Sequence, residues 1–172
     1  TSICIRTNGE VWIATARGDL QQYDSLHNSF KAYNVFHQSK PVISNWIDKI
    51  YDTGQNSLLV GTSNQGVKLF DLGTKTYKDI LTYSPVDQTE IYARDFIRYS
   101  EQEYWIATES GLFIYNMATG KYLNLRKKHG DPYSISDNAV YTFCKDKEGG
   151  IWLGTYFGGL NYYPKPYMPF EK

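Results

Sequence analysis

The sequence predicts an all-β fold, and three observations support this prediction. Aromatic residues make up 16% of the chain, with sixteen Tyr and four Trp, and such side chains fit the half-buried surface of a pleated sheet. Short runs rich in Val, Ile, Tyr and Trp alternate with turns rich in Gly, Asn and Asp, as in strands joined by hairpins. The same pattern recurs four times at intervals of 47, 46 and 47 residues, marked by the aligned threonines Thr15, Thr62, Thr108 and Thr155.

Each repeat has the pattern of four short strands. In the second repeat, an inner strand "NWIDKIY" and a turn "DTGQN" precede the strand "SLLVGT", and a loop "SNQG" follows it. The strand "VKLFD", the turn "LGTK" and the outer strand "TYKDIL" complete the unit. A repeated four-stranded meander of about 45 residues is typical of a β-propeller blade. One meander alone has open edges and an unburied apolar face, and packing the blades around an axis buries that face.

The repeats predict four blades within a single propeller segment, at about residues 1–36, 37–84, 85–130 and 131–172. The last blade looks truncated, because "PKPYMPFEK" stands where its outer strand would begin. Propellers have about four to eight blades, so we expect a segment of a larger propeller. The remaining blades would come from the parent protein or from a second copy of the chain. Exposed blade faces at both ends predict self-association, and we expect a homodimer.

One aromatic or aliphatic position precedes each aligned threonine by three residues, at Trp12, Leu59, Trp105 and Trp152. We interpret these side chains as anchors that fill the wedge between blades. The loop after this strand ends in a glycine in every repeat, for which we expect a positive φ. These glycines are Gly18, Gly66, Gly111 and Gly159.

Composition and motifs argue against several functions. Lys plus Arg and Asp plus Glu each total 18, which gives no reason to expect a nucleic-acid partner. The histidines His27, His37 and His129 lie in turn or linker contexts without the spacing of metal ligands, and no phosphate-binding or hydrolase motif occurs. We therefore expect no catalytic residue, no metal and no cofactor. Cys4 and Cys144 occupy equivalent positions in the first and fourth repeats, which favours buried thiols of inner strands.

A ligand would bind at the loops that follow the second and fourth strand of each blade. These loops open on one face and vary most between repeats, and variable loops on a repeated scaffold commonly carry function. Trp and Tyr can stack on sugar rings while Asn, Gln, Arg and Glu bond hydroxyl groups, which suits a carbohydrate. The alternative is that they are ordinary solvated loop residues, and Asn138 in particular fits a capping or turn role. The candidates are Arg17, Asn45, Trp46, Gln65, Tyr92, Arg94, Glu109, Asn138, Tyr156 and Phe157.

The fourth repeat carries a recognisable pattern, D-x-x-G-G-[IL]-W-[IL]-G-T-x-x-G-G-L-x-x-Y, from Asp146 to Tyr163. It resembles the two-component regulator propeller repeat of the periplasmic sensor regions of bacterial hybrid two-component systems, found especially in gut Bacteroides. The other repeats depart from the pattern at Ala14, Leu59 and Ala107. The resemblance implies a periplasmic segment of an inner-membrane-anchored histidine kinase that senses an oligosaccharide. Contact with the membrane would come only through the rest of the parent protein.

Two other functions compete with this interpretation. A propeller of this kind can serve as a scaffold for protein interactions. It can also be a lyase, with repeats that share related turns. A lyase would need His and acidic residues converging on the propeller axis, and the inner strands offer Asp48, Lys49, Arg94 and Asp95 but no His.

Overall fold

The structure, a computed structural model, describes residues 2–36 and 45–165. Fifteen strands form four antiparallel sheets in this part of the chain, and no helix occurs among these residues, which confirms the all-β prediction. We number the sheets 1 to 4 in chain order. Sheet 1 holds β1 (Ser2–Ile5), β2 (Val11–Ala14), β3 (Asp19–Asp24) and β4 (Ser29–Asn34). Sheet 2 holds β5 (Ile47–Asp52), β6 (Ser57–Thr62), β7 (Val67–Asp71) and β8 (Tyr77–Leu81).

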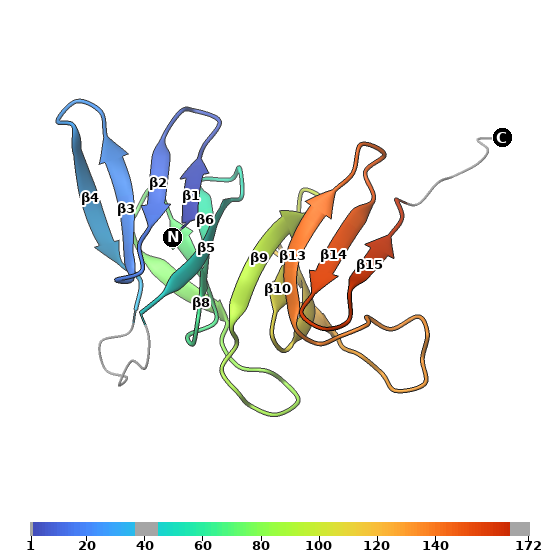
Figure 1. Ribbon diagram of the computed structural model, residues 1–172. Helices are drawn as coiled ribbons and strands as arrows, with labels where there is room; N and C mark the ends of the chain where they lie inside the picture. The colour runs from blue at the N-terminus through green and yellow to red at the C-terminus, as the bar shows by residue number, and fades with distance from the viewer. Residues whose placement is uncertain (1, 37–44, 166–172) are drawn as a thin grey trace.

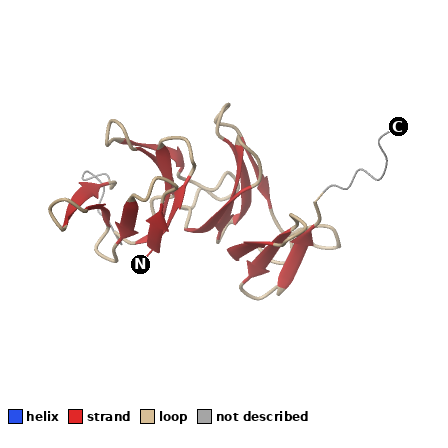
Figure 2. Ribbon diagram, turned by 90° about the horizontal axis from the view of Figure 1, so that it is seen from above, coloured by secondary structure: helices blue, strands red, loops and turns tan. Residues whose placement is uncertain are grey.

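The other two sheets repeat this meander. Sheet 3 holds β9 (Ala93–Arg98), β10 (Glu103–Thr108), β11 (Gly111–Asn116) and β12 (Tyr122–Leu125). Sheet 4 has three strands among the described residues, β13 (Val140–Lys145), β14 (Ile151–Thr155) and β15 (Leu160–Tyr163). In each sheet, strands that are neighbours in sequence are hydrogen-bonded neighbours in space. The sheets follow one another in chain order, and β1, β5, β9 and β13 are the strands through which successive sheets meet (Figures 1 and 2).

Among residues 2–36 and 45–165, the hydrophobic core consists of three clusters, and each cluster lies between two neighbouring sheets. We call the face that a sheet turns to the next sheet its trailing face, and the face that it turns to the preceding sheet its leading face. The trailing faces contribute the anchor position and the first apolar residue of the third strand. The buried members of these trailing faces include Trp12 and Leu20, Leu59 and Val67, and Trp105 and Leu112.

The leading faces contribute inner-strand and second-strand residues to the same clusters. Their members are Ile50, Leu58 and Val60 on sheet 2, Phe96, Tyr104 and Ile106 on sheet 3, and Phe143, Ile151 and Leu153 on sheet 4. The anchor prediction is therefore confirmed for Trp12, Leu59 and Trp105, which are all buried. Trp152 differs, because no described sheet covers the trailing face of sheet 4, and its side chain is 39% exposed.

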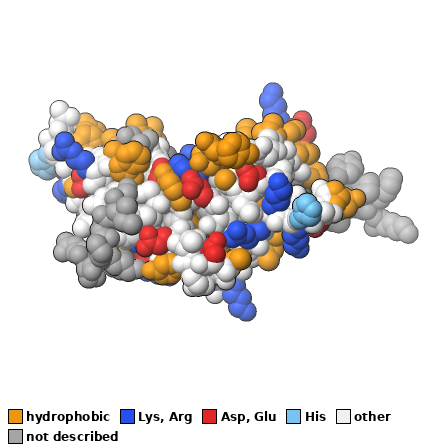
Figure 3. Space-filling model, turned by 60° about the horizontal axis from the view of Figure 1, so that its bottom comes forward, with side chains coloured by type: hydrophobic (Ala, Val, Ile, Leu, Met, Phe, Trp, Pro, Cys, Tyr) orange, Lys and Arg blue, Asp and Glu red, His pale blue; other side chains and the backbone are white. Residues whose placement is uncertain are grey.

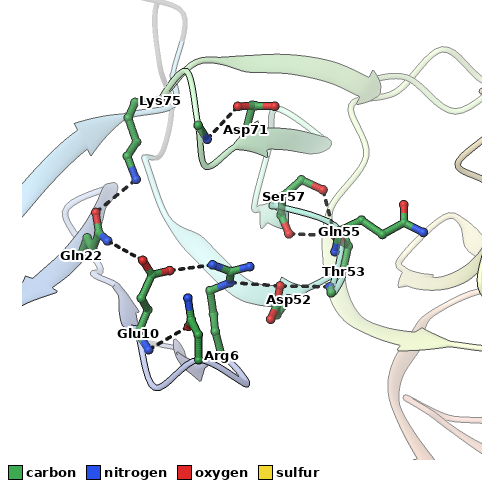
Figure 4. A network of polar contacts seen from close by, with 12 residues as sticks. Arg6, Glu10, Gln22, Asp52, Thr53, Gln55, Ser57, Asp71 and Lys75 are labelled. Carbon is green, nitrogen blue, oxygen red and sulfur yellow. Dashed lines mark hydrogen bonds and ion pairs between the residues drawn. The ribbon is translucent and has the colours of Figure 1, made fainter.

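Polar contacts also join sheets 1 and 2, at the turns opposite the variable loops (Figure 4). The Lys75 ammonium lies 4.9 Å from the centre of the Trp12 ring and donates to Gln22 at 3.2 Å. Arg6 pairs with Glu10 at 2.6 Å and with Asp52 of the next sheet at 3.4 Å. A cation over an aromatic face adds about 0.5–2 kcal/mol, so Lys75 reinforces the apolar contact beneath it.

The loop-end glycines have the expected backbone conformation. The φ angles of Gly18, Gly66, Gly111 and Gly159 are 86°, 67°, 110° and 75°. At Gly66, a Cβ atom would also stand 1.9 Å from the carbonyl oxygen of Leu81, so only glycine fits there.

The two cysteines are free and differ in burial. Cys4 is partly buried and packs against the cluster between sheets 1 and 2, and burial raises the pKa of its thiol. Cys144 is exposed, so the expectation of a buried thiol is wrong at this position. The reason is that Cys144 lies opposite Trp152 on the trailing face of sheet 4, which no described sheet covers.

Candidate functional site

Three β-bulges bring the candidate site together. The pairing register shifts between Ile47 and Lys49, between Ala93 and Asp95, and between Val140 and Thr142. The residue inside each shift lies fourteen positions before the aligned threonine of its repeat. A bulge bends its strand and re-aims one side chain, so all three sheets present an equivalent residue at the same end of their inner strands. These residues are Asp48, Arg94 and Tyr141.

Arg94 is the centre of the contacts between them. Its Cζ atom lies 3.6 Å from the centre of the Tyr92 ring and 4.4 Å from that of Tyr141. Nη2 donates to the Tyr141 hydroxyl at 3.1 Å and to the Glu109 carboxylate, and Nη1 lies 3.8 Å from Oδ1 of Asp48. The guanidinium thus contacts side chains carried by sheets 2, 3 and 4. The Arg94 side chain is 22% exposed.

Burial and neighbouring charges shift the pKa values of the groups in this cluster. Burial lowers the pKa of Arg94, but the hydrogen bond to Glu109 and the neighbouring groups outweigh it, so the net pKa is raised and Arg94 stays cationic. Burial raises the pKa of Asp48, against the lowering effects of Arg94 and of the 3.2 Å hydrogen bond from Tyr92. Burial also raises the pKa of Tyr92 and Tyr141, so both phenols are neutral. Two carboxylates surround one guanidinium, an arrangement better suited to hydroxyl groups than to anions.

A second polar layer lies one residue further along each inner strand. Lys49 pairs with Asp95 at 2.9 Å, which links β5 to β9. The other oxygen of Asp95 accepts hydrogen bonds from the Thr142 hydroxyl at 3.1 Å and from the backbone N–H of Phe143 at 3.0 Å. This layer therefore holds the three inner strands together directly beneath the Arg94 cluster.

Two exposed aromatic rings stand beside Tyr141. Tyr156 stacks on Tyr141 with ring centres 5.2 Å apart and planes at 22°, and Phe157 meets Tyr156 edge-on at 4.3 Å. Tyr156 is 60% exposed and Phe157 87% exposed. Their backbone is fixed, because Tyr156 N–H donates to the Ala139 carbonyl and Phe157 N–H to Asp137, both at 2.9 Å. The loop thus presents its rings to solvent on an ordered backbone.

The space-filling view from the side of these loops shows hydrophobic, acidic and basic side chains interspersed (Figure 3). Among the described residues, no extended patch of one charge is visible in this view. Such a mixed surface fits a ligand that offers both apolar faces and hydroxyl groups.

The structure brings five of the predicted residues into one cluster, namely Tyr92, Arg94, Glu109, Tyr156 and Phe157.

The other candidates lie outside this cluster. Arg17 and Asn45 are exposed in loops of sheets 1 and 2, and the Asn45 carbonyl lies against Gly18. Trp46 is exposed at the position equivalent to Tyr92, and Gln65 is buried. Asn138 accepts hydrogen bonds from the backbone N–H groups of Lys127 and Gly111, both at 2.8 Å, as its alternative role as a turn residue predicts.

Two members of the cluster were not among the predicted ligand residues. The sequence pattern indicated Asp48 only as an acidic residue of an inner strand and did not single out Tyr141. Both occupy the repeat position of Arg94, so the alignment of the threonines contained the signal that could have found them.

The lyase alternative requires a histidine near the propeller axis, and the Arg94 cluster contains none. His27 pairs with Asp24 at 2.9 Å in the β3–β4 turn, His129 lies in the loop before β13, and His37 is outside the described residues. Within residues 2–36 and 45–165, no group of three or more His, Cys, Asp and Glu residues is placed to hold a metal ion. The same part of the chain contains no helix that is long and apolar enough to cross a membrane.

Comparison with known proteins agrees with the sequence pattern. Residues 134–157 match the family model described as two component regulator propeller, which confirms the resemblance noted in the fourth repeat. The chain is 29% identical over 167 residues to Histidine kinase P4 of Formosa agariphila. This match covers 93% of the chain and 12% of that kinase, so the chain spans about an eighth of the relative's length.

Solved structures show the same fold. The extracellular domain of a putative one component system from B. thetaiotaomicron superposes with a TM-score of 0.79 at 17% identity, over 94% of this chain and 21% of that one. The extracellular domain of a putative hybrid two component system from the same organism gives 0.60 at 18% identity, over 94% and 26%. The chain is therefore a β-propeller segment that is similar to parts of bacterial signalling proteins.

Proposed function

We propose that this chain is a sensor segment of the extracytoplasmic region of a hybrid two-component histidine kinase and response regulator, and that it binds an oligosaccharide at the Arg94 cluster. The observation that carries this proposal is the continuous contact from the exposed rings of Phe157 and Tyr156 to the partly buried guanidinium of Arg94. Phe157 contacts Tyr156, Tyr156 stacks on Tyr141, and Tyr141 bonds Arg94. The similarity to a histidine kinase and to extracellular signalling domains supports the sensor role and the extracytoplasmic location.

A neutral sugar ring fits the chemistry of this surface. Its apolar face would stack on Tyr156 or Phe157, and its hydroxyl groups would bond the carboxylate of Glu109, whose side chain is 40% exposed. A hydroxyl that bonds Glu109 competes with the bond between Glu109 and Arg94. Binding would thereby change a contact shared by three sheets, and a ligand that prefers one arrangement shifts the population toward it. In the parent protein, an inner-membrane anchor and a kinase would carry this shift across the membrane.

Isothermal titration calorimetry against a panel of neutral and acidic oligosaccharides tests the proposal. We expect binding by a neutral member of the panel, and about a tenfold or greater loss of affinity in Tyr156→Ala and Phe157→Ala. Tyr133→Ala is the matched control, because Tyr133 is an exposed aromatic residue on the neighbouring loop and outside the cluster. Absence of binding across the panel, or equal affinity in all variants, would contradict the proposal. A protein partner that is lost on the same substitutions would instead favour the scaffold alternative.

A further inference from the structure

Another exposed aromatic ring, that of Trp46, stands on the side of the molecule that carries the variable loops, which we call the loop face. Trp46 precedes the aligned threonine of its repeat by sixteen residues, as Tyr92 does in the next repeat, so the two rings occupy equivalent positions. The Tyr92 ring lies against the guanidinium of Arg94 inside the cluster. The Trp46 side chain lies outside the cluster and is 55% exposed.

The backbone that carries Trp46 is held on two sides. On its own sheet, the N–H of Ser63 donates to the Trp46 carbonyl at 3.1 Å. Toward sheet 1, the carbonyl oxygen of the preceding residue, Asn45, packs so closely on Gly18 that a Cβ atom there would stand 2.4 Å from it. The indole is therefore presented on a backbone with defined contacts, as are the exposed rings of sheet 4.

One backbone hydrogen bond recurs on sheets 2, 3 and 4 and sets two side chains next to each other on the loop face of each sheet. The N–H of the residue after the aligned threonine donates to the carbonyl of the residue sixteen positions before that threonine. The pairs are Ser63 with Trp46, Glu109 with Tyr92, and Tyr156 with Ala139, at 3.1, 3.2 and 2.9 Å. Because β5, β9 and β13 contact one another in this order (Figure 1), the three pairs form a row across the loop face.

This row has an exposed aromatic ring at each end and a polar centre. Trp46 stands at the end formed by sheet 2, and Tyr156 stands at the end formed by sheet 4. Between them, sheet 3 presents the Glu109 carboxylate, whose side chain is 40% exposed. Packed sheets lie about 10 Å apart, so two rings that are two sheets apart are separated by about 20 Å. A disaccharide is too short to stack on both rings.

We propose that the ligand of the Arg94 cluster is a linear oligosaccharide longer than a disaccharide, which stacks on Tyr156 or Phe157 at one end and on Trp46 at the other. Hydroxyl groups of the sugar rings in between bond Glu109. This inference rests on the proposed function, because it specifies the length and the placement of the ligand at the same site. Once one end is bound, the contact at the other end is intramolecular, so affinity rises with chain length until both rings are covered.

Isothermal titration calorimetry with oligosaccharides of graded length tests this arrangement. The probes are linear gluco-, manno- and xylo-oligosaccharides, each from the disaccharide to the hexasaccharide. In a series that binds, we expect the hexasaccharide to bind about tenfold or more tightly than the disaccharide. Trp46→Ala should abolish this gain and leave the disaccharide unaffected, whereas Tyr156→Ala should weaken both. Trp152→Ala is the matched control, because Trp152 is a partly exposed tryptophan on the trailing face of sheet 4.

Fluorine NMR of the chain labelled with 5-fluorotryptophan gives a local readout of the same contact. The chain has four tryptophans, and the signal that disappears in Trp46→Phe belongs to Trp46. The hexasaccharide should shift this signal, the disaccharide should not, and the signal of the buried Trp12 should stay unchanged with both. Trp46→Phe keeps an aromatic ring and should retain most of the affinity gained with length. Circular dichroism establishes that each variant is folded.

The outcomes separate this inference from the proposed function. Binding that requires Tyr156 but depends neither on chain length nor on Trp46 overturns the two-ended arrangement and leaves the proposed function in place. A hexasaccharide that binds without shifting the Trp46 signal does the same. If no series binds, or if Tyr156→Ala binds like the unaltered chain, the proposed function is wrong and this inference with it.

Discussion

The carboxylate of Asp95 accepts a hydrogen bond from the backbone N–H of Phe143 at 3.0 Å. A side chain of β9 thus pairs with a backbone donor at the edge of the next inner strand, β13. The same relationship joins the first two sheets, where the Ser2 hydroxyl accepts the N–H of Ile50. Asp95 and Ser2 share one repeat position, thirteen residues before the aligned threonine. Between sheets 2 and 3, this position is Lys49, whose ammonium group cannot accept a hydrogen bond. The N–H of Phe96 donates instead to the Asp95 carboxylate of its own strand at 3.0 Å.

Removal of the Asp95 carboxylate should destabilise the chain. We expect Asp95→Ala to lower the free energy of unfolding by about 2 kcal/mol, because the Phe143 amide and the Thr142 hydroxyl both lose their acceptor in a largely buried place. Asp95→Asn keeps one acceptor oxygen and should cost less. Urea denaturation measures both changes. Equal stability of Asp95→Ala and the unaltered chain would show that water replaces the carboxylate without loss.

The two tryptophans Trp105 and Trp152 occupy equivalent positions in different surroundings. We expect Trp105→Ala to cost about 3–5 kcal/mol, since it leaves a cavity between sheets 3 and 4. Trp152→Ala should cost about 1 kcal/mol or less, because the side chain is partly exposed in the single chain. Denaturant titrations of the two variants compare the pair. Similar losses in both variants would mean that Trp152 is already covered.

Replacement of Arg94 by lysine separates charge from shape. Lysine keeps the positive charge but loses the flat contact with Tyr92 and Tyr141 and the bond geometry to Glu109. We expect Arg94→Lys to weaken oligosaccharide binding about tenfold, since Tyr141 and Glu109 lose their fixed positions. Arg98→Lys is the matched control, because Arg98 lies at the opposite end of β9 and bonds the Ser100 carbonyl outside the cluster. Full affinity in Arg94→Lys would show that positive charge alone is sufficient.

Asp87 should titrate far below an ordinary carboxyl group. Hydrogen bonds from the side chains of Thr89 and Ser84 and from the Thr89 backbone lower its pKa from 3.8 to about 2. A depressed pKa in the folded state contributes stability that is complete above the unfolded pKa and is lost as the pH falls from about 4 through 2. A carboxyl-detected NMR titration measures the pKa directly. Thr89→Ala should move it upward, and an unchanged titration would contradict the assigned cause.

The repeat spacing predicted the strands well because a hairpin pattern is local. The strands expected in the second repeat coincide closely with β5 to β8, and the anchor positions are buried wherever a sheet follows. The blade limits after residues 36, 84 and 130 fall in connections between sheets and stay predictions.

The candidate site was predictable only in part. Loop variability pointed to Tyr92, Glu109 and Tyr156, but the meeting of Asp48, Arg94 and Tyr141 depends on three bulges. A bulge is a shift of pairing between two strands, so the pattern of one strand does not reveal it. The exposure of Trp152 could likewise not be predicted from the local sequence, because it depends on whether another sheet covers that face of sheet 4.

Because each core cluster joins only adjacent sheets, the chain should open from its ends, as in a row of units coupled to their nearest neighbours. Sheets 2 and 3 are held on both faces, so amide hydrogens of β5 and β9 should exchange last, and those of β4 and β15 first. Asp48 and Arg94 stand on these slow-exchanging strands. We therefore expect the backbone that carries them to be ordered before a ligand arrives, which lowers the entropy lost on binding.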